Sequence, residues 1–170
     1  MLRGDDGAFR TVYRAVQPPL LRYLSVLVGR VDAEDVASEA WAQAFRDLDR
    51  FSGDADGFRG WITTIGRNRA LDHLRRSRRR PTDERTVEDL VDLVDDADVE
   101  GDTLGRVHSQ AALALVASLP RDQAEAIILR TVLGFDAATA GQILGKSPGA
   151  VRAASFRGLR QLAKKIDRDA

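Results

Sequence analysis

The chain of 170 residues has no cysteine, only two histidines and no apolar run long enough to cross a membrane. Without cysteine, disulfide bonds and thiolate metal sites are excluded. His73 and His108 lie on different segments and are too few for a typical zinc catalytic site. The longest apolar run, residues 20–28, is too short to span a bilayer, and no signal peptide precedes it. We therefore expect a cytoplasmic protein with no membrane insertion of its own, no metal and no cofactor.

Charge is balanced over the whole chain but not along it. The 26 basic and 26 acidic residues sum to zero. Residues 59–80 carry eight basic and one acidic side chain, 83–102 carry one and ten, and 146–168 carry seven and one. Two basic segments therefore flank an acidic one, and the neutral total conceals two candidate DNA-binding faces.

The apolar residues of the N-terminal part recur at helical spacing. They predict a first helix that Pro18 and Pro19 break or kink, and a second over 32–48 with Asp32 as its N-cap. A third helix is predicted over 58–80 and ends before Pro81. The polar stretch between the second and third helices indicates a loop.

The C-terminal part predicts a helix-turn-helix. Apolar spacing indicates helices over 111–119, 120–134, 135–145 and 150–166, with Ser147 as N-cap of the last. One face of the last helix is predicted to pack on the domain: Val151, Ser155, Gly158, Leu159, Leu162 and Ile166. The opposite face carries arginines, as in a recognition helix that enters the major groove. A helical hairpin with incidental arginines is the alternative.

No stretch alternates with period two, so an all-α fold is expected. We predict two small helical domains, residues 1–81 and 106–170, joined by an acidic linker over 82–105. The apolar residues of that linker are sufficient for a short helix over 87–94.

Three surfaces of these helices have residue types suited to binding. The 67–80 segment is rich in arginine, which binds phosphates, and Asn68 offers an amide that can pair with a base edge. The alternative is a surface helix whose C-terminal arginines only complement its dipole. The preceding loop has Phe51 and Phe58 at its two ends, placed either to hold an unstacked base or to fill the core. The second helix presents Asp35 and Glu39 on its polar stripe, which is solvated, docks a partner or holds part of a metal site.

Together these segments resemble a bacterial RNA polymerase sigma factor of the extracytoplasmic function (ECF) group, over nearly the whole chain. Residues 32–41 are similar to region 2.2 of that family, 58–76 to regions 2.3 and 2.4, and 119–162 to region 4. The resemblance implies binding to core RNA polymerase, to promoter DNA and to an anti-sigma factor, with no catalytic residue and no enzymatic activity.

The resemblance also implies which residues bind. Core polymerase would be bound by Asp35, Ser38, Glu39 and Ala42. The minus-ten element would be bound by Phe51, Ser52, Asp54, Phe58, Arg67, Asn68, His73, Arg75 and Arg76. The minus-thirty-five element would be bound by Ser147, Arg152, Ala153, Phe156, Arg157 and Arg160.

Four positions depart from the family pattern. Ser38 replaces a frequent glutamine, and Gly66 replaces a frequent alanine. Ala154 stands where a basic residue is frequent, which predicts a weaker upstream DNA contact. Ser155 stands where leucine is frequent, which predicts weaker packing of the recognition helix.

Two other functions remain open from the residues alone. A free-standing helix-turn-helix regulator would bind duplex DNA without polymerase. A metal-dependent nuclease would use Asp35 and Glu39 with magnesium.

Overall fold

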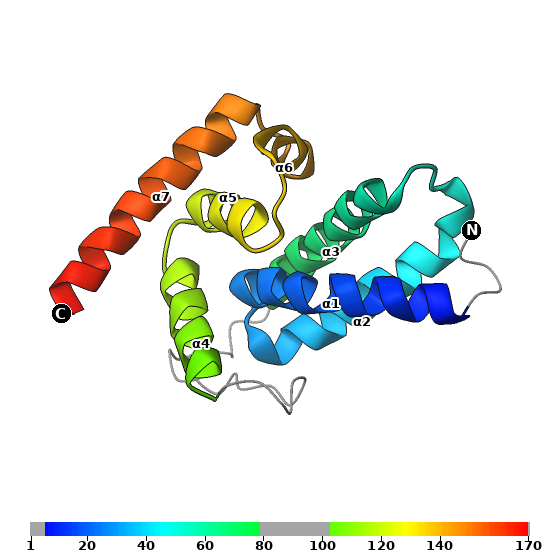
Figure 1. The fold of residues 1–170 in the computed structure, drawn as a ribbon, viewed down its shortest axis with the longest axis horizontal. Coiled ribbons are helices and arrows are strands. Elements are labelled where there is room, and N and C mark those ends of the chain that lie inside the picture. Colours follow the sequence, from blue (N-terminus) through cyan, green and yellow to red (C-terminus); the bar gives the residue numbers. More distant parts are fainter. Residues whose placement is uncertain (1–5, 79–102, 170) are drawn as a thin grey trace.

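Helices make up nearly all of the chain that the computed structural model describes, residues 6–78 and 103–169. The α-helices are α1 (Asp6–Val28), α2 (Arg30–Arg46), α3 (Ala55–Arg78), α4 (Thr103–Ala117), α5 (Arg121–Thr131), α6 (Ala137–Leu144) and α7 (Pro148–Asp169), with a short 3-10 helix, η1, at Leu48–Arg50. The described residues contain no strand, which confirms the all-α fold. Figure 1 shows α1–α3 at one end of the molecule and α7 at the other.

The prediction was a helix broken or kinked at Pro18 and Pro19. Helix α1 runs without interruption through both prolines, so the break is wrong. Each proline removes one backbone donor, but burial of the apolar face on both sides of the pair compensates for that loss. Leu20 and Leu24 are fully buried, and Val16 is 5% exposed.

The break between α1 and α2 is at Gly29, which has a φ of 82° and is the N-cap of α2. This left-handed conformation suits glycine, because it has no Cβ. The prediction that Asp32 caps this helix is therefore wrong. Asp32 lies in the first turn of α2, and its carboxylate contacts His73 Nε2 of α3 at 3.0 Å. The helix also ends at Arg46, two residues before the predicted Leu48.

Two hydrophobic cores organise the described residues. One is formed by α1, α2 and α3 and includes Leu20, Ala37 and Ile62. The other is formed mainly by α4–α7 and includes Ile128 and Val151. We call these sets of helices the N-terminal unit (α1–α3) and the C-terminal unit (α4–α7). Most of the predicted linker, and its short helix over 87–94, lies outside the described residues.

Caps of two different kinds define the helix-turn-helix. The Asp136 carboxylate accepts a hydrogen bond from the Thr139 amide at 2.7 Å at the start of α6, and this bond lowers the pKa of Asp136. Ser147 Oγ accepts from the Ala150 amide at 3.1 Å at the start of α7, as predicted. Gly145 ends α6 in the left-handed conformation.

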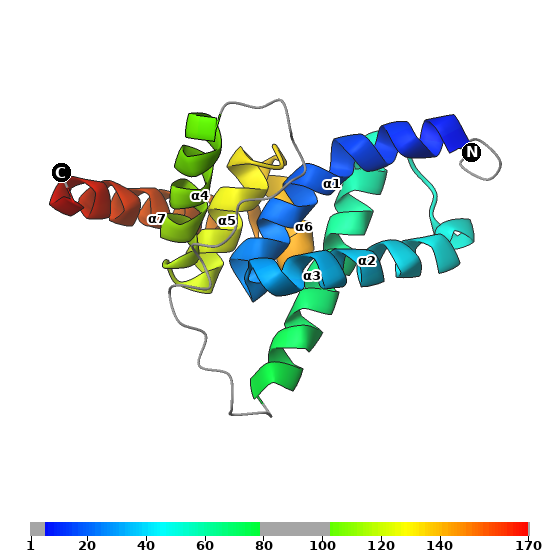
Figure 2. The same cartoon turned by 90° about the horizontal axis from the view of Figure 1, so that it is seen from below.

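The packing face of α7 differs from the prediction at its distal end. Val151, Ser155 and Gly158 are buried as expected, but Leu159 is 48% and Ile166 is 55% exposed. Figure 2 shows the reason, because the C-terminal half of α7 extends beyond the rest of the molecule. Ala154 is only 2% exposed and belongs to the core. A basic side chain at position 154 would start from the core and not from the recognition face. The expectation that the lack of a basic residue there weakens a DNA contact is therefore wrong.

Candidate nucleic-acid interface

The polar stripe of α2 lies on the surface. Asp35, Ser38, Glu39 and Ala42 are all exposed, while Val36 and Ala40 on the opposite face are buried. Neither Asp35 nor Glu39 forms an ion pair within the described residues. The stripe is thus available to a partner, and its charge favours a basic one.

The basic face of α3 is only partly available. Asn68, Arg75 and Arg76 are exposed, and Arg75 pairs with Asp72 at 3.0 Å on the same surface. His73 is half-buried beside α2. Residues 79 and 80, the last arginines of the predicted basic helix, lie outside the described residues.

The loop before α3 has exposed polar residues and two aromatic side chains that are partly or fully buried. Ser52 and Asp54 are exposed, and the Asp54 carboxylate accepts a hydrogen bond from the Gly57 amide at 2.8 Å, so it helps to start α3. Phe51 is half-buried and stacks on Trp61, with ring centroids 5.0 Å apart. Phe58 is 6% exposed and belongs to the core. The structure therefore supports the packing interpretation for Phe58, and Phe51 is half-buried and packs against the same core.

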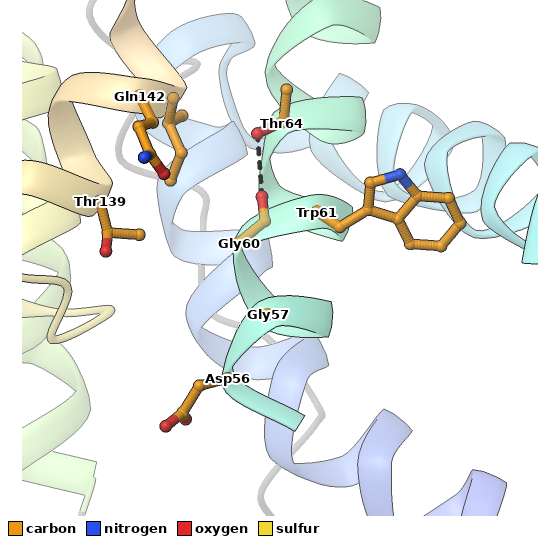
Figure 3. A pocket seen from close by; sticks show the side chains of 8 residues that line it. Asp56, Gly57, Gly60, Trp61, Thr64, Thr139 and Gln142 are labelled. Atoms are coloured by element: carbon orange, nitrogen blue, oxygen red, sulfur yellow. Dashed lines mark hydrogen bonds between the residues drawn. The ribbon is translucent and has the colours of Figure 1, made fainter. Parts of the chain in front are cut away.

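A cleft of about 350 Å³ separates this part of α3 from α6 (Figure 3). Asp56, Gly60 and Thr64 line one side, and Thr139 and Gln142 line the other. Figure 3 shows Trp61 turned away from α6 toward its own unit. Beside the cleft the two helices still meet, because a Cβ at Gly60 would lie 3.8 Å from Cγ2 of Thr139.

The recognition face of α7 is fully on the surface. Its predicted members Ser147, Arg152, Ala153, Phe156, Arg157 and Arg160 are all exposed. Phe156 is 62% exposed, and the Arg160 guanidinium lies 5.8 Å from its ring centroid. Arg157 has only a distant partner, Asp122 at 3.9 Å, and both side chains are solvated. Such a pair contributes little and is easily exchanged for a phosphate.

Arg67, unlike its exposed neighbours on α3, is mostly buried, and the sequence did not predict the contact that buries it. Its Nε donates to Glu125 Oε1 of α5 at 2.7 Å, and its side chain is only 16% exposed. The hydroxyl of Tyr23 on α1 donates to the same oxygen at 2.7 Å. We call Tyr23, Arg67 and Glu125 the interdomain triad. The one available signal in the sequence was a carboxylate within the otherwise apolar run of 124–129.

Burial changes the ionisation of the triad. Desolvation, followed by the charge and the hydrogen bond of Glu125, raises the pKa of Tyr23 well above its ordinary value. For Arg67, burial lowers the pKa, but the hydrogen bonds and charge of Glu125 outweigh it, and the net pKa is raised. At neutral pH the triad therefore contains a neutral phenol and a cationic guanidinium.

This ionisation predicts a loss of stability at alkaline pH. In the unfolded chain Tyr23 releases its proton near pH 10, whereas in the folded chain the raised pKa retains it. Its contribution to stability is complete below pH 10 and is lost as pH rises further, by about 1.4 kcal/mol per pH unit. Urea unfolding at pH 8 and pH 11 measures this, and Tyr23→Phe should lose less stability than the parent. The matched control Tyr13→Phe should behave as the parent; equal pH dependence in all three proteins would contradict the prediction.

The described residues, 6–78 and 103–169, offer neither a metal site nor a membrane span. No group of three or more potential metal ligands occurs there. No helix among these residues is long and apolar enough to span a bilayer.

Known proteins share both the sequence pattern and the fold. Residues 12–80 match the family model of sigma-70 region 2, and residues 109–162 match sigma-70 region 4. The ECF RNA polymerase sigma factor ShbA of Streptomyces griseus is 31% identical over 95% of this chain and 88% of its own length. The ECF RNA polymerase sigma factor BldN of Streptomyces coelicolor is 31% identical over 98% of this chain, which spans 63% of the BldN length.

A solved structure has the same arrangement of helices. The sigma factor RpoE of Bartonella quintana, in complex with the anti-sigma factor NepR, superposes with a TM-score of 0.73 at 23% identity, covering 96% of this chain and 99% of RpoE. This likeness shows the fold. With region 2 and region 4 both matched along the chain, the protein belongs to the ECF group of RNA polymerase sigma factors.

Proposed function

We propose that the chain binds core RNA polymerase through α2, directs it to promoters and opens promoter DNA, without catalytic residues of its own. The observation that carries this proposal is the presence of three separate exposed surfaces on one chain. These are the acidic stripe of α2, the basic end of α3 and the arginine face of α7. A simple duplex-binding regulator needs only the last of them.

The DNA-binding roles are divided between the two units. The minus-ten element would be contacted by Ser52, Asn68, Arg75 and Arg76 on the N-terminal unit, with Phe51 at the edge of the loop. The minus-thirty-five element would be contacted by the exposed face of α7. The proposed domains are residues 1–81 and 106–170; α4 begins at Thr103, so it includes the last three residues of the predicted linker.

The proposal includes control by an anti-sigma factor in the cytoplasm. Its support is the fold shared with RpoE, whose structure was solved with NepR bound. The exposed apolar side chains of α7, Leu159 and Ile166, offer additional surface for such a partner.

Run-off transcription tests the proposal. The purified chain added to core polymerase should yield discrete transcripts from a library of genomic promoters, and core alone should not. A library without any transcript dependent on the chain would overturn the proposal. A gel shift with and without core enzyme separates it from the stand-alone regulator, which would bind duplex DNA tightly without core. Magnesium-dependent cleavage of the same DNA would instead indicate the nuclease alternative.

Contacts between α7 and phosphates predict a change in salt dependence. Arg152→Ala should remove one phosphate contact, so the slope of log K against log salt should become shallower by roughly one unit. Fluorescence anisotropy of the holoenzyme on a promoter recovered from the library measures this slope. The matched control is Arg130→Ala, an exposed arginine on α5 of the same unit. A parental slope for Arg152→Ala would place this residue outside the phosphate contacts.

A further inference from the structure

The exposed face of α1 carries three arginines that pair with no carboxylate of the protein as described. Arg10, Arg14 and Arg22 are all exposed. None of them forms an ion pair within residues 6–78 and 103–169. Spacings of four and eight residues place them along one side of the helix, about 6 Å and about 12 Å apart along its axis. The function proposed above does not use this face.

Nothing within α1 compensates for this charge. Like charges four residues apart repel each other in a helix, and Arg10 and Arg14 have this spacing. Asp6 is the only acidic side chain of α1, and it forms no ion pair in the described part of the chain. The helix dipole does not account for the arginines either, because the last turn of α1 contains no basic residue. They therefore add repulsion without an internal contact in return, which favours an external polyanion as their ligand.

The N-terminal end of this face lies beside the loop before α3. Phe9, next to Arg10 in the chain, packs on the Phe45 ring with centroids 4.9 Å apart, and it lines one small hollow together with Leu48 and Phe58. Leu48 and Phe58 flank the loop that carries the proposed minus-ten contacts. Figure 1 shows the N-terminal end of α1 on the same side of the molecule as this loop. A DNA strand that leaves the loop along α1 would therefore meet the three arginines in turn.

The loop itself is poorly suited to phosphates. Asp49, Asp54 and Asp56 are exposed there, and their charge repels a phosphate backbone, although the aromatic and hydroxyl groups beside them suit a base. A single strand whose base enters this loop needs its phosphates neutralised next to the loop and not within it. Arginine is suited to that task, because its guanidinium is always charged and pairs with phosphate through two N–H donors. Three such groups in line match a repeating phosphate chain.

We propose that Arg10, Arg14 and Arg22 form a phosphate-binding track on α1, which holds the single DNA strand that leaves the loop before α3. The inference rests on the proposed function, because it requires promoter DNA to be opened at this loop. The track is independent of sequence, since arginines that contact phosphates read no base.

The salt dependence of binding to a fork DNA tests the track. The fork carries only the minus-ten part of a promoter recovered by run-off transcription and continues as a single non-template strand. In the holoenzyme, Arg10→Ala with Arg14→Ala should make the slope of log K against log salt shallower by about 1.4 units, or about 0.7 for each phosphate contact on a single strand. Arg10→Lys with Arg14→Lys keeps the charge and should keep the parental slope. The matched control, Arg121→Ala with Arg130→Ala, removes two exposed arginines from α5 and should also keep it.

Two outcomes of this measurement would overturn the track. One is a parental slope for the double alanine variant. The other is a weaker affinity of that variant for core polymerase without DNA, with the slope on the fork unchanged, because the arginines would then bind protein. Helical circular dichroism of the variant should match the parent, since alanine is a good helix former. Failure of the proposed function would appear separately, as an absence of run-off transcripts with the parent.

A crosslink locates the strand directly. The chain has no cysteine, so Arg14→Cys provides a single site for a photoreactive thiol reagent, which is attached before core polymerase is added. Illumination should join the labelled chain to the single strand of the fork, whereas the reagent at Gln161→Cys on α7 should not reach that strand. Crosslinks from Arg14→Cys to polymerase subunits alone would overturn the track.

Discussion

Gly141→Ala is expected to destabilise the C-terminal unit by about 2 kcal/mol or more and to abolish binding to the upstream promoter element. A Cβ at this position would lie 2.4 Å from the Lys146 carbonyl oxygen, far inside van der Waals contact. The obstacle is backbone, so it cannot rotate away as a side chain would. The Lys146 amide also donates to the Gly141 carbonyl at 2.9 Å, which fixes the turn to the last part of α6.

Relief of this clash must move Lys146 and with it the start of α7. Since α7 presents the arginine face, a shift at its first turn displaces every predicted contact to upstream DNA. Thermal unfolding measures the stability, and anisotropy on upstream duplex measures the binding. Gly149→Ala is the matched control, because a Cβ there meets nothing within 4 Å, and it should keep parental stability and binding. Parental stability of Gly141→Ala would show that the turn tolerates a different path.

Reversal of charge on α2 is the second large expected effect. Asp35→Lys with Glu39→Lys should weaken binding to core polymerase by about 30-fold or more, as expected when charge pairs at an interface are lost and replaced by repulsion. Both side chains are exposed, and neither is paired within the described part of the chain. The substitutions therefore remove no internal contact, and lysine is a good helix former.

The fold and the DNA-binding face should survive this reversal. Helical circular dichroism and thermal unfolding should match the parent, while surface plasmon resonance on immobilised core shows the lost affinity. Asp167→Lys makes a charge reversal at an exposed position of α7 and should bind core as the parent does. Equal core affinity for the α2 variant and this control would remove α2 from the docking surface and leave the loop before α3 as the next candidate.

Local patterns were sufficient for most of the helices. Ser147 at the start of α7 and the glycine at its preceding turn were recognisable, because caps and turns depend on a few adjacent residues. The errors arose where distant packing outweighs a local preference. Pro18 and Pro19 disfavour a continuous helix locally, but apolar side chains on both sides of the pair, such as Val16 and Leu20, are buried, and the helix continues. Asp32 has the chemistry of an N-cap, but Gly29 begins the helix and Asp32 instead contacts His73.

The same distinction holds for the candidate surfaces: local spacing was sufficient to predict some exposed residues, whereas distant contacts decided the burial of others. Spacing placed Asp35, Glu39 and Arg152 on exposed helical faces, and they are exposed. Exposure of Phe58 and Arg67 depended on contacts between segments far apart in the chain. Phe58 packs among the rings of Trp41 and Trp61, and Arg67 is held by a carboxylate 58 positions away.

The sequence by itself determined an all-α chain with three candidate binding surfaces and the resemblance to the sigma factor family, because helical periodicity, caps and charge clusters act over a few residues. Only the tertiary structure decided how the two units meet. The meeting of Tyr23, Arg67 and Glu125 requires three helices to approach one another, and no local rule specifies which carboxylate a buried arginine will find. Because of that contact, Arg67 belongs to the basic segment in the sequence but is mostly buried in the structure.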